Sequence, residues 1–173
     1  MPSKALIIVD MLNDFIDEKG LLYCGESARE IVPFIKQRLA AFRKNKDLVV
    51  FLQDAHDRND KEFEKFPEHC VRGTWGSRII QALAPLPGEN VVPKKRFSGF
   101  YGTELEKILA QAGIAAVEVV GVCTSICVMD TVGGLANRDY SITVPVKGVA
   151  DFDSEFHRFA LKRMEKLYGA EVS

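Results

Sequence analysis

Apolar runs of strand length recur along the chain, separated by segments in which apolar positions repeat with a helical period. The runs are rich in Val and Ile and apolar on both faces, as in ALIIV at residues 5–9. Such runs are typical of central parallel strands that are covered by helices. The pattern predicts strands at residues 5–9, 48–52, 90–92, 117–122 and 142–146.

The helix-period segments have recognisable ends. Pro33 suits the first turn of a helix and would fit badly in its interior. Thr103 and Glu106 have the spacing of a capping box, and Gly113 and Gly169 are positioned to end helices. The alternation of strand and helix predicts an α/β fold with a mostly parallel sheet. Helices are expected at residues 33–45, 103–112, 124–137 and 154–167.

The composition fits one compact domain spanning residues 1–173. Of its residues, 47% are hydrophobic and 27% are charged, and the formal net charge is −1. A nearly neutral chain gives no reason to expect nucleic acid or an anionic membrane as a partner. No apolar stretch approaches the roughly 20 residues that span a bilayer, and the N-terminal residues lack the features of a signal peptide. We therefore expect a cytoplasmic protein.

The chain has four cysteines, Cys24, Cys70, Cys123 and Cys127. A chain of this size and core content does not need disulfides for stability. Cys123 and Cys127 are four positions apart, which differs from the C-x-x-C spacing of zinc and redox motifs. Reduced thiols are expected, and this leaves one of them available for chemistry.

Reactive side chains follow the predicted strands where each strand ends. Asp10 follows the first run, and Asp54 and His56 follow the second. Lys94 follows the third run, and the fourth leads into Cys127 at the start of a helix. The carboxyl ends of parallel strands meet at one edge of a sheet, so these groups should converge. A carboxylate, an amine and a thiol meet the needs of nucleophilic acyl transfer, and the first turn of a helix favours the thiolate.

Each of these residues also has an ordinary structural interpretation. Cys127 alone could be a small core filler, and Asp10 could cap the turn that follows its strand. Lys94 could be a surface lysine, with Lys95 beside it as a competing candidate. The convergence of several reactive groups on one edge favours the catalytic interpretation over these alternatives.

A second group of polar residues contains Asp54, His56, Glu62 and His69. Mixed nitrogen and oxygen ligands suit a divalent metal ion, and zinc, manganese and iron all fit. The alternative is a charged surface loop in which His69 is simply solvated. The third histidine, His157, lies in the last predicted helix and is expected to be structural.

Three segments resemble one known family. Residues 10–15 resemble the D-x-x-N-D-F opening of nicotinamidases and isochorismatase-like cysteine hydrolases. Residues 94–103 resemble the family's K-x-x-x-S-x-F-x-G-T segment, and residues 121–128 resemble its G-V-x-T-x-x-C-V nucleophile motif. All three occur in the family's order and spacing, and the likeness extends from about Ala5 to Asp151. The resemblance implies a doubly wound, Rossmann-like parallel sheet with helices on both faces.

The resemblance also implies roles for individual residues. It assigns the catalytic triad to Asp10, Lys94 and Cys127, with a cis peptide before Cys123. The backbone N–H groups of Cys123 and Cys127 would then form an oxyanion hole. In the nicotinamidase branch a metal ion holds the pyridine nitrogen of the substrate. The matching ligands here are Asp54, His56, His69 and Glu62, and Phe15 and Trp75 match the aromatic residues that flank the ring. Ordinary core packing is the alternative for Trp75.

We therefore expect a cysteine-dependent amidohydrolase. The most specific form of this hypothesis is a nicotinamidase that converts nicotinamide to nicotinate and ammonia through a thioester, as in NAD salvage. Its cofactor would be a divalent metal ion, with zinc expected first. The alternatives are a relative acting on another small amide, such as a carbamoyl or ureido compound, and a non-catalytic α/β binding protein. Relatives of this kind often complete their crevices with a neighbouring subunit, so a homo-oligomer is expected.

Overall fold

The computed structural model describes residues 4–173 and places seven strands in one sheet. The strand order is β3-β2-β1-β4-β5-β7, and the short β6 pairs with the end of β4. All of these pairings are parallel, which confirms the predicted α/β fold. The strands are β1 (Lys4–Val9), β2 (Leu48–Asp54), β3 (Asn90–Lys94), β4 (Ala116–Val122), β5 (Ser141–Val144), β6 (Val149–Ala150) and β7 (Glu171–Val172).

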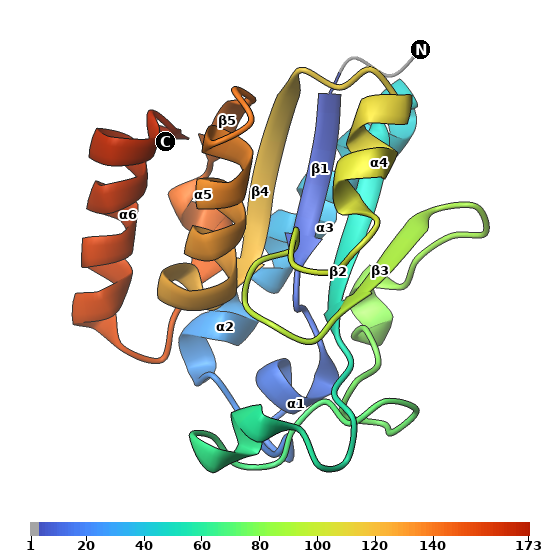
Figure 1. The fold of residues 1–173 in the computed structure, drawn as a ribbon, viewed down its shortest axis with the longest axis vertical. Helices are drawn as coiled ribbons and strands as arrows, with labels where there is room; N and C mark the ends of the chain where they lie inside the picture. The colour runs from blue at the N-terminus through green and yellow to red at the C-terminus, as the bar shows by residue number, and fades with distance from the viewer. Residues whose placement is uncertain (1–3) are drawn as a thin grey trace.

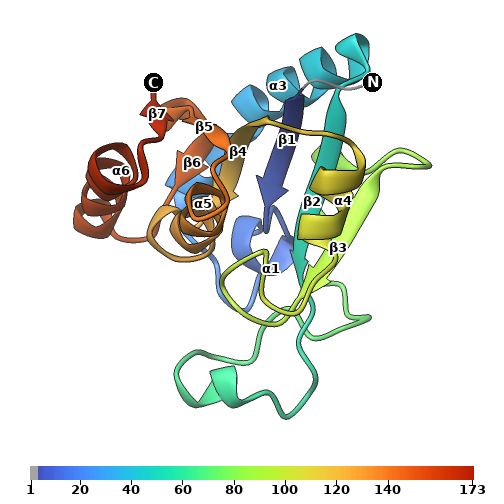
Figure 2. The same cartoon turned by 45° about the horizontal axis from the view of Figure 1, so that its top comes forward.

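Helices cover both faces of the sheet (Figures 1 and 2). On one face, apolar side chains of α1, α2 and α3 form a buried core with Leu6 and Ile8 of β1. On the other face, α4, α5 and α6 form a second core with Ile7 of the same strand. Within residues 4–173, no helix combines the length and apolar character needed to cross a membrane. The helices are α1 (Asn13–Ile16), α2 (Glu26–Glu30), α3 (Val32–Asn45), α4 (Leu105–Gln111), α5 (Met129–Ala136) and α6 (Ser154–Tyr168).

Most helix ends follow the sequence signals. Pro33 lies in the first turn of α3, and Gly169 ends α6 with a φ of 67°. The expected capping box at α4 forms only in part: the helix begins at Leu105, whose backbone N–H donates a 3.3 Å hydrogen bond to the Thr103 hydroxyl. The Thr103 hydroxyl donates to the carbonyl of Gly99, and the Glu106 carboxylate accepts from Arg138 instead of turning back to the helix start.

The order in which the chain adds strands to the sheet reverses between β1 and β4. It adds β2 and β3 on one side of β1, and later adds β4 and β5 on the other. Gly121 of β4 pairs with Val9 of β1 and has a φ of 122°. A Cβ atom at Gly121 would lie 2.1 Å from the Val9 carbonyl oxygen, so only glycine permits this close approach. The crevice beyond this switch point is where open α/β sheets bind ligands.

Candidate active site

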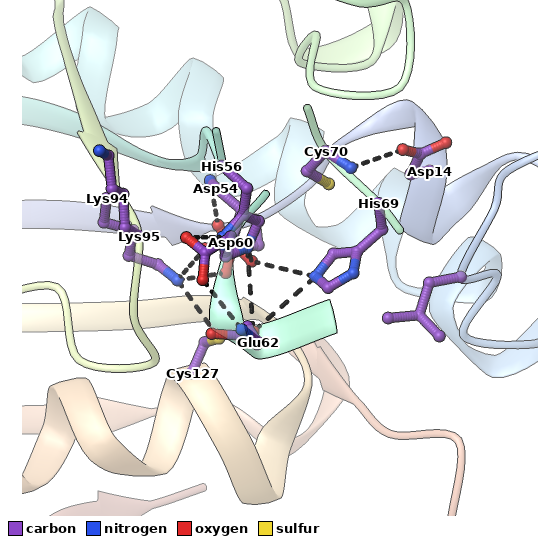
Figure 3. A network of polar contacts seen from close by, with 12 residues as sticks. Asp14, Asp54, His56, Asp60, Glu62, His69, Cys70, Lys94, Lys95 and Cys127 are labelled. Atoms are coloured by element: carbon purple, nitrogen blue, oxygen red, sulfur yellow. Dashed lines mark hydrogen bonds and ion pairs between the residues drawn. The ribbon is translucent and has the colours of Figure 1, made fainter. Parts of the chain in front are cut away.

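Lys94 brings the predicted triad together. It is the last residue of β3, and its buried ammonium lies 2.9 Å from Oδ2 of Asp10, which follows β1 directly. The same Nζ atom lies 3.3 Å from Sγ of Cys127, which is buried in a π-helical turn (Thr124–Val128) after β4. Lys94 also hydrogen bonds to Asp54, its Cα partner in β2. Lys95, the competing candidate, instead pairs with Asp57 at the surface. Lys94 is therefore the lysine of this cluster (Figure 3).

The backbone holds Asp10 in an unusual conformation. Its φ is 50°, in the left-handed region that non-glycine residues seldom occupy, and such strain is often found at functional sites. One carboxylate oxygen accepts a hydrogen bond of 2.9 Å from the backbone N–H of Asp54. The other oxygen faces the Lys94 ammonium, and a carboxylate oxygen lies within 4.8 Å of the Cys127 sulfur. Asp10 is thereby positioned to accept a proton from Cys127.

The charges of the cluster act on the pKa of Cys127 in opposite directions. Burial raises the pKa of Cys127 well above its usual range, and the Asp10 and Asp54 carboxylates add to this effect against the influence of Lys94. Burial and the charge of Asp54 also raise the pKa of Asp10, to about 6. The start of a helix was expected to favour the thiolate, whereas burial and the two carboxylates favour the neutral thiol. Proximity to a helix start is outweighed by burial beside two carboxylates.

The turn that carries Cys127 is fixed by backbone hydrogen bonds. The peptide between Val122 and Cys123 is cis, as the resemblance implies. The carbonyl of Cys123 accepts hydrogen bonds from the N–H groups of Ile126 and Val128, at 3.1 and 3.2 Å. These bonds hold the turn as it enters α5.

The four expected metal ligands also meet in one cluster. Donor atoms of Asp54, His56, Glu62 and His69 all lie within 4.8 Å of one another, and all four side chains are buried (Figure 3). His56 Nε2 lies 3.5 Å from the Asp54 carboxylate and 3.8 Å from that of Glu62. His69 Nε2 lies 4.0 and 3.9 Å from the same two groups. Ligands around a zinc ion at about 2.1 Å lie roughly 3.4 Å apart, so the residues fit a divalent ion with little adjustment.

An unpaired atom supports the same interpretation. His56 Nε2 is buried and has no hydrogen-bond partner within the described residues, which is costly for a polar atom unless a ligand satisfies it. Burial also lowers the pKa of His69, which keeps its imidazole neutral and able to bind a metal ion. In both histidines the opposite ring nitrogen already has a partner, so the two Nε2 atoms are the ones left to coordinate.

Asp60 is a residue of this site that the motifs did not single out. Its carboxylate lies 3.2 Å from Nδ1 of His56 and accepts a 2.9 Å hydrogen bond from the backbone N–H of Glu62. It also pairs with the guanidinium of Arg96 at 2.9 Å. One carboxylate therefore orients one ligand and fixes the short 3₁₀ helix (Lys61–Glu64) that carries another. The feature of the sequence that could have identified Asp60 is its acidic side chain two positions before the candidate ligand Glu62.

Replacing Asp60 with asparagine is expected to weaken metal binding by about 10- to 100-fold, because the carboxylate orients His56 and increases its basicity. The dissociation constant for zinc, measured by competition with a chromophoric chelator, checks this expectation. Asp57→Asn is the matched control, because Asp57 lies in the same loop but pairs with exposed Lys95 rather than with a metal-ligand candidate. Equal zinc affinity in Asp60→Asn and the wild type would remove Asp60 from the site.

A cavity of about 310 Å³ adjoins both clusters. Its lining includes Asp10, Cys127 and the metal-ligand candidates Asp54, Glu62 and His69. The remaining wall is largely apolar and aromatic. Besides the expected Phe15, it contains four aromatic residues that sequence analysis did not select, because they come from loops far apart in the chain: Tyr23, Phe66, Phe97 and Phe152.

Trp75 does not line this cavity, so neither expectation for it is met. Its side chain is 46% exposed, which also excludes ordinary core packing. The reason is the fold of its loop: the Trp75 carbonyl accepts hydrogen bonds from the Asn13 side chain and from the backbone N–H of Arg78. Phe66 and Phe97 provide the aromatic wall in its place.

His157 lies in α6, outside the catalytic and metal clusters, and its Nδ1 is 2.8 Å from the hydroxyl of Thr124. This contact joins α6 to the turn that carries Cys127.

Comparison with known proteins identifies the family. The family model of the isochorismatase domain matches residues 4–173. The chain belongs to the isochorismatase family. Among solved structures of this family, it is similar to the nicotinamidase/pyrazinamidase PncA from Bacillus subtilis, with a TM-score of 0.94 and 38% identity over 99% of each chain.

Two further similar structures bear on the substrate and the metal. The N-carbamoylsarcosine amidase from Thermoplasma acidophilum has a TM-score of 0.90 and 33% identity, over 99% of this chain and 95% of that one. The pyrazinamidase of Pyrococcus horikoshii, solved in complex with zinc, has a TM-score of 0.93 and 28% identity over 99% of each chain. The chain is accordingly an isochorismatase-family amidohydrolase, an enzyme that hydrolyses amide bonds. The expectation of an enzyme rather than a binding protein is confirmed.

Proposed function

We propose that this amidohydrolase is a nicotinamidase that converts nicotinamide to nicotinate and ammonia. The observation that carries the proposal is one cavity lined jointly by aromatic rings, metal-ligand candidates and the Asp10–Cys127 pair. An aromatic wall suits a flat heteroaromatic ring, and the thiol lies where an amide carbon can be attacked. Similarity to the Bacillus subtilis nicotinamidase supports the same substrate.

The proposed reaction begins with transfer of the Cys127 thiol proton to Asp10 as the sulfur attacks the amide carbon. The thiolate that develops lies 3.3 Å from the Lys94 ammonium, which stabilises its charge. Backbone N–H groups of Cys123 and Cys127 would hold the oxyanion. Asp10 then returns the proton to the departing ammonia. In the second half, Asp10 takes a proton from water, the resulting hydroxide attacks the thioester, and Cys127 leaves as the thiol.

Asp54, His56, Glu62 and His69 would hold the divalent cofactor, for which we propose zinc. The clustered donors and the unpaired His56 Nε2 support the site, and the zinc complex of the similar pyrazinamidase supports the metal. When bound, the ion would supply a Lewis acid for a ring nitrogen of the substrate. Phe15 would contact the ring, together with Phe66 and Phe97.

The alternative substrate is a carbamoyl or ureido compound, which the similarity to N-carbamoylsarcosine amidase favours. Sarcosine derivatives carry a carboxylate, and a buried carboxylate needs a cationic partner. Within residues 4–173, the lining of the cavity includes neither Lys nor Arg but does include Asp10, Asp54 and Glu62. A neutral amide such as nicotinamide therefore needs no cation besides the proposed metal ion at its ring nitrogen, whereas the carboxylate of an anionic substrate would have to occupy that ion.

Purified metal-replete protein is expected to release ammonia and nicotinate from nicotinamide, and prior chelation should abolish the release until zinc is restored. N-carbamoylsarcosine serves as the anionic comparison substrate and should give no ammonia. Ammonia from N-carbamoylsarcosine but not from nicotinamide would replace the proposed substrate with the alternative. Full nicotinamide turnover after chelation would contradict a role for the metal while leaving the triad in place.

A homo-oligomer and a cytoplasmic location stay predictions. In support of subunit contacts, the aromatic side chains of Phe152, Phe156 and Phe159 are exposed in and beside α6, and Phe152 also lines the cavity. A role in NAD salvage depends on the proposed substrate.

A further inference from the structure

Two thiols that take no part in the proposed chemistry meet in the wall of the cavity. The sulfur atoms of Cys24 and Cys123 are 3.3 Å apart, although the residues are separated by 99 positions in the chain. Cys24 belongs to the segment between α1 and α2, where its backbone N–H donates to the carbonyl of Phe15. Both side chains are largely buried and both line the cavity. A small molecule inside the cavity therefore has access to this pair.

The pair is close to the geometry of a disulfide. A sulfur–sulfur bond is about 2.05 Å long, so the two atoms need to approach by about 1.3 Å. The other two cysteines have different surroundings: Sγ of Cys70 faces the carbonyl of Gly76, and that of Cys127 accepts from Lys94. The contact thus singles out one pair among the four thiols.

We propose that Cys24 and Cys123 form an oxidation site, at which a small hydroperoxide converts the two thiols to a disulfide and thereby suppresses hydrolysis. The pair does not depend on the identity of the amide substrate. The contact with the Cys24 sulfur, together with burial, raises the pKa of Cys123 and makes its thiol a poor first nucleophile.

The chemistry balances with the hydroperoxide as oxidant. The Cys24 sulfur attacks the terminal peroxide oxygen, the O–O bond breaks, and the alkoxide takes up the thiol proton and leaves as the alcohol. This gives a sulfenic acid at Cys24. The Cys123 sulfur then attacks that sulfur, the S–O bond breaks, and hydroxide leaves as water with the Cys123 proton. The two thiols lose two electrons in total, and the hydroperoxide is reduced to alcohol and water.

A disulfide between Cys24 and Cys123 would affect the position of the nucleophile, Cys127. The carbonyl of Cys123 accepts the hydrogen bonds that hold the turn around Cys127, so drawing Cys123 towards Cys24 displaces this turn. A displacement near 1 Å in a catalytic group is expected to lower kcat/KM by about 10- to 100-fold. A dithiol reductant should restore the activity, because the disulfide faces the cavity.

The test is treatment of the reduced full-length protein with tert-butyl hydroperoxide, followed by alkylation under denaturing conditions and peptide mass spectrometry. The four free thiols should fall to two, and the tryptic peptide of residues 20–29 should become linked to that of residues 108–138. The second peptide contains both Cys123 and Cys127, so fragmentation must locate the link and find Cys127 alkylated. Amide hydrolysis is measured before and after oxidation, relative to the reduced form of the same protein.

Matched variants distinguish oxidation of Cys24 and Cys123 from oxidation of the other thiols. Cys24→Ser should form no link and keep its activity in the oxidant, whereas Cys70→Ala should link and lose activity as the wild type does. A link that includes Cys127, or oxidation of Cys127 while Cys24 and Cys123 stay free, would overturn the proposal. So would a Cys24–Cys123 link that leaves hydrolysis unchanged. Because the link is read by mass, a failure of the nicotinamidase assignment would leave that measurement intact, and the loss of hydrolysis would then be measured with the amide that the enzyme does hydrolyse.

Discussion

Replacing Cys127 with alanine is expected to lower kcat for the amide substrate by about 10⁴-fold or more, because no other group at the site can form the acyl intermediate. Removal of one small buried sulfur should change the free energy of unfolding by only about 1–2 kcal/mol. Ammonia release at saturating substrate and urea unfolding measure the two quantities separately.

Cys70→Ala is the control for this variant, because Cys70 is also fully buried but its sulfur lies outside the Lys94 cluster. It should keep at least a tenth of the wild-type kcat. Turnover by Cys127→Ala at a similar level would exclude Cys127 as the nucleophile. Loss of the cooperative unfolding transition in either variant would show that the activity change reflects folding.

Replacing Lys94 with methionine is expected to lower the free energy of unfolding by about 3–5 kcal/mol, because it leaves two buried carboxylates without their cation. Lys94 Nζ is completely buried between Asp10 and Asp54, and their charges raise its pKa well above the usual range despite burial. Urea unfolding of chelator-treated protein measures the loss without a contribution from bound metal. Activity should also fall by orders of magnitude, because the thiolate loses its countercharge.

Lys95→Met is the matched control, because Lys95 is adjacent in sequence but half exposed and paired only with Asp57. Its free energy of unfolding should change by less than about 1 kcal/mol. If Lys94→Met proves as stable as Lys95→Met, the buried ion pairs do not hold the strand ends together. Only the activities of the two variants would then distinguish Lys94 from Lys95 as the lysine of the site.

The positions of the main strands could be predicted from the sequence, because a buried parallel strand needs a continuous apolar run and each such run is local. The helix ends at Pro33 and Gly169 could also be predicted, because the fixed φ of proline and the left-handed φ that glycine tolerates are properties of single residues. The capping box at Thr103 forms only in part, because the Glu106 carboxylate pairs with Arg138, 32 positions away, instead of turning back to the start of the helix.

The candidate site likewise has a part that could be predicted from the sequence and a part that could not. Parallel strands bring the residues at their carboxyl ends to one edge of the sheet, so the convergence of Asp10, Lys94 and Cys127 could be predicted from their places after apolar runs. Their protonation could not, because the pKa of Cys127 depends on burial and on carboxylates that approach only in the folded chain. The exposure of Trp75 depends in the same way on how its loop folds.

The sequence by itself determined the order of elements and the reactive groups at the strand ends, because local spacing and backbone preference specify both. The tertiary structure alone decided which groups from the loops touch. Asp60 reaches His56 through the fold of a loop, and Cys24 meets Cys123 across 99 residues. No local pattern encodes such contacts, since they arise from the packing of segments that the chain brings together only when the sheet is complete.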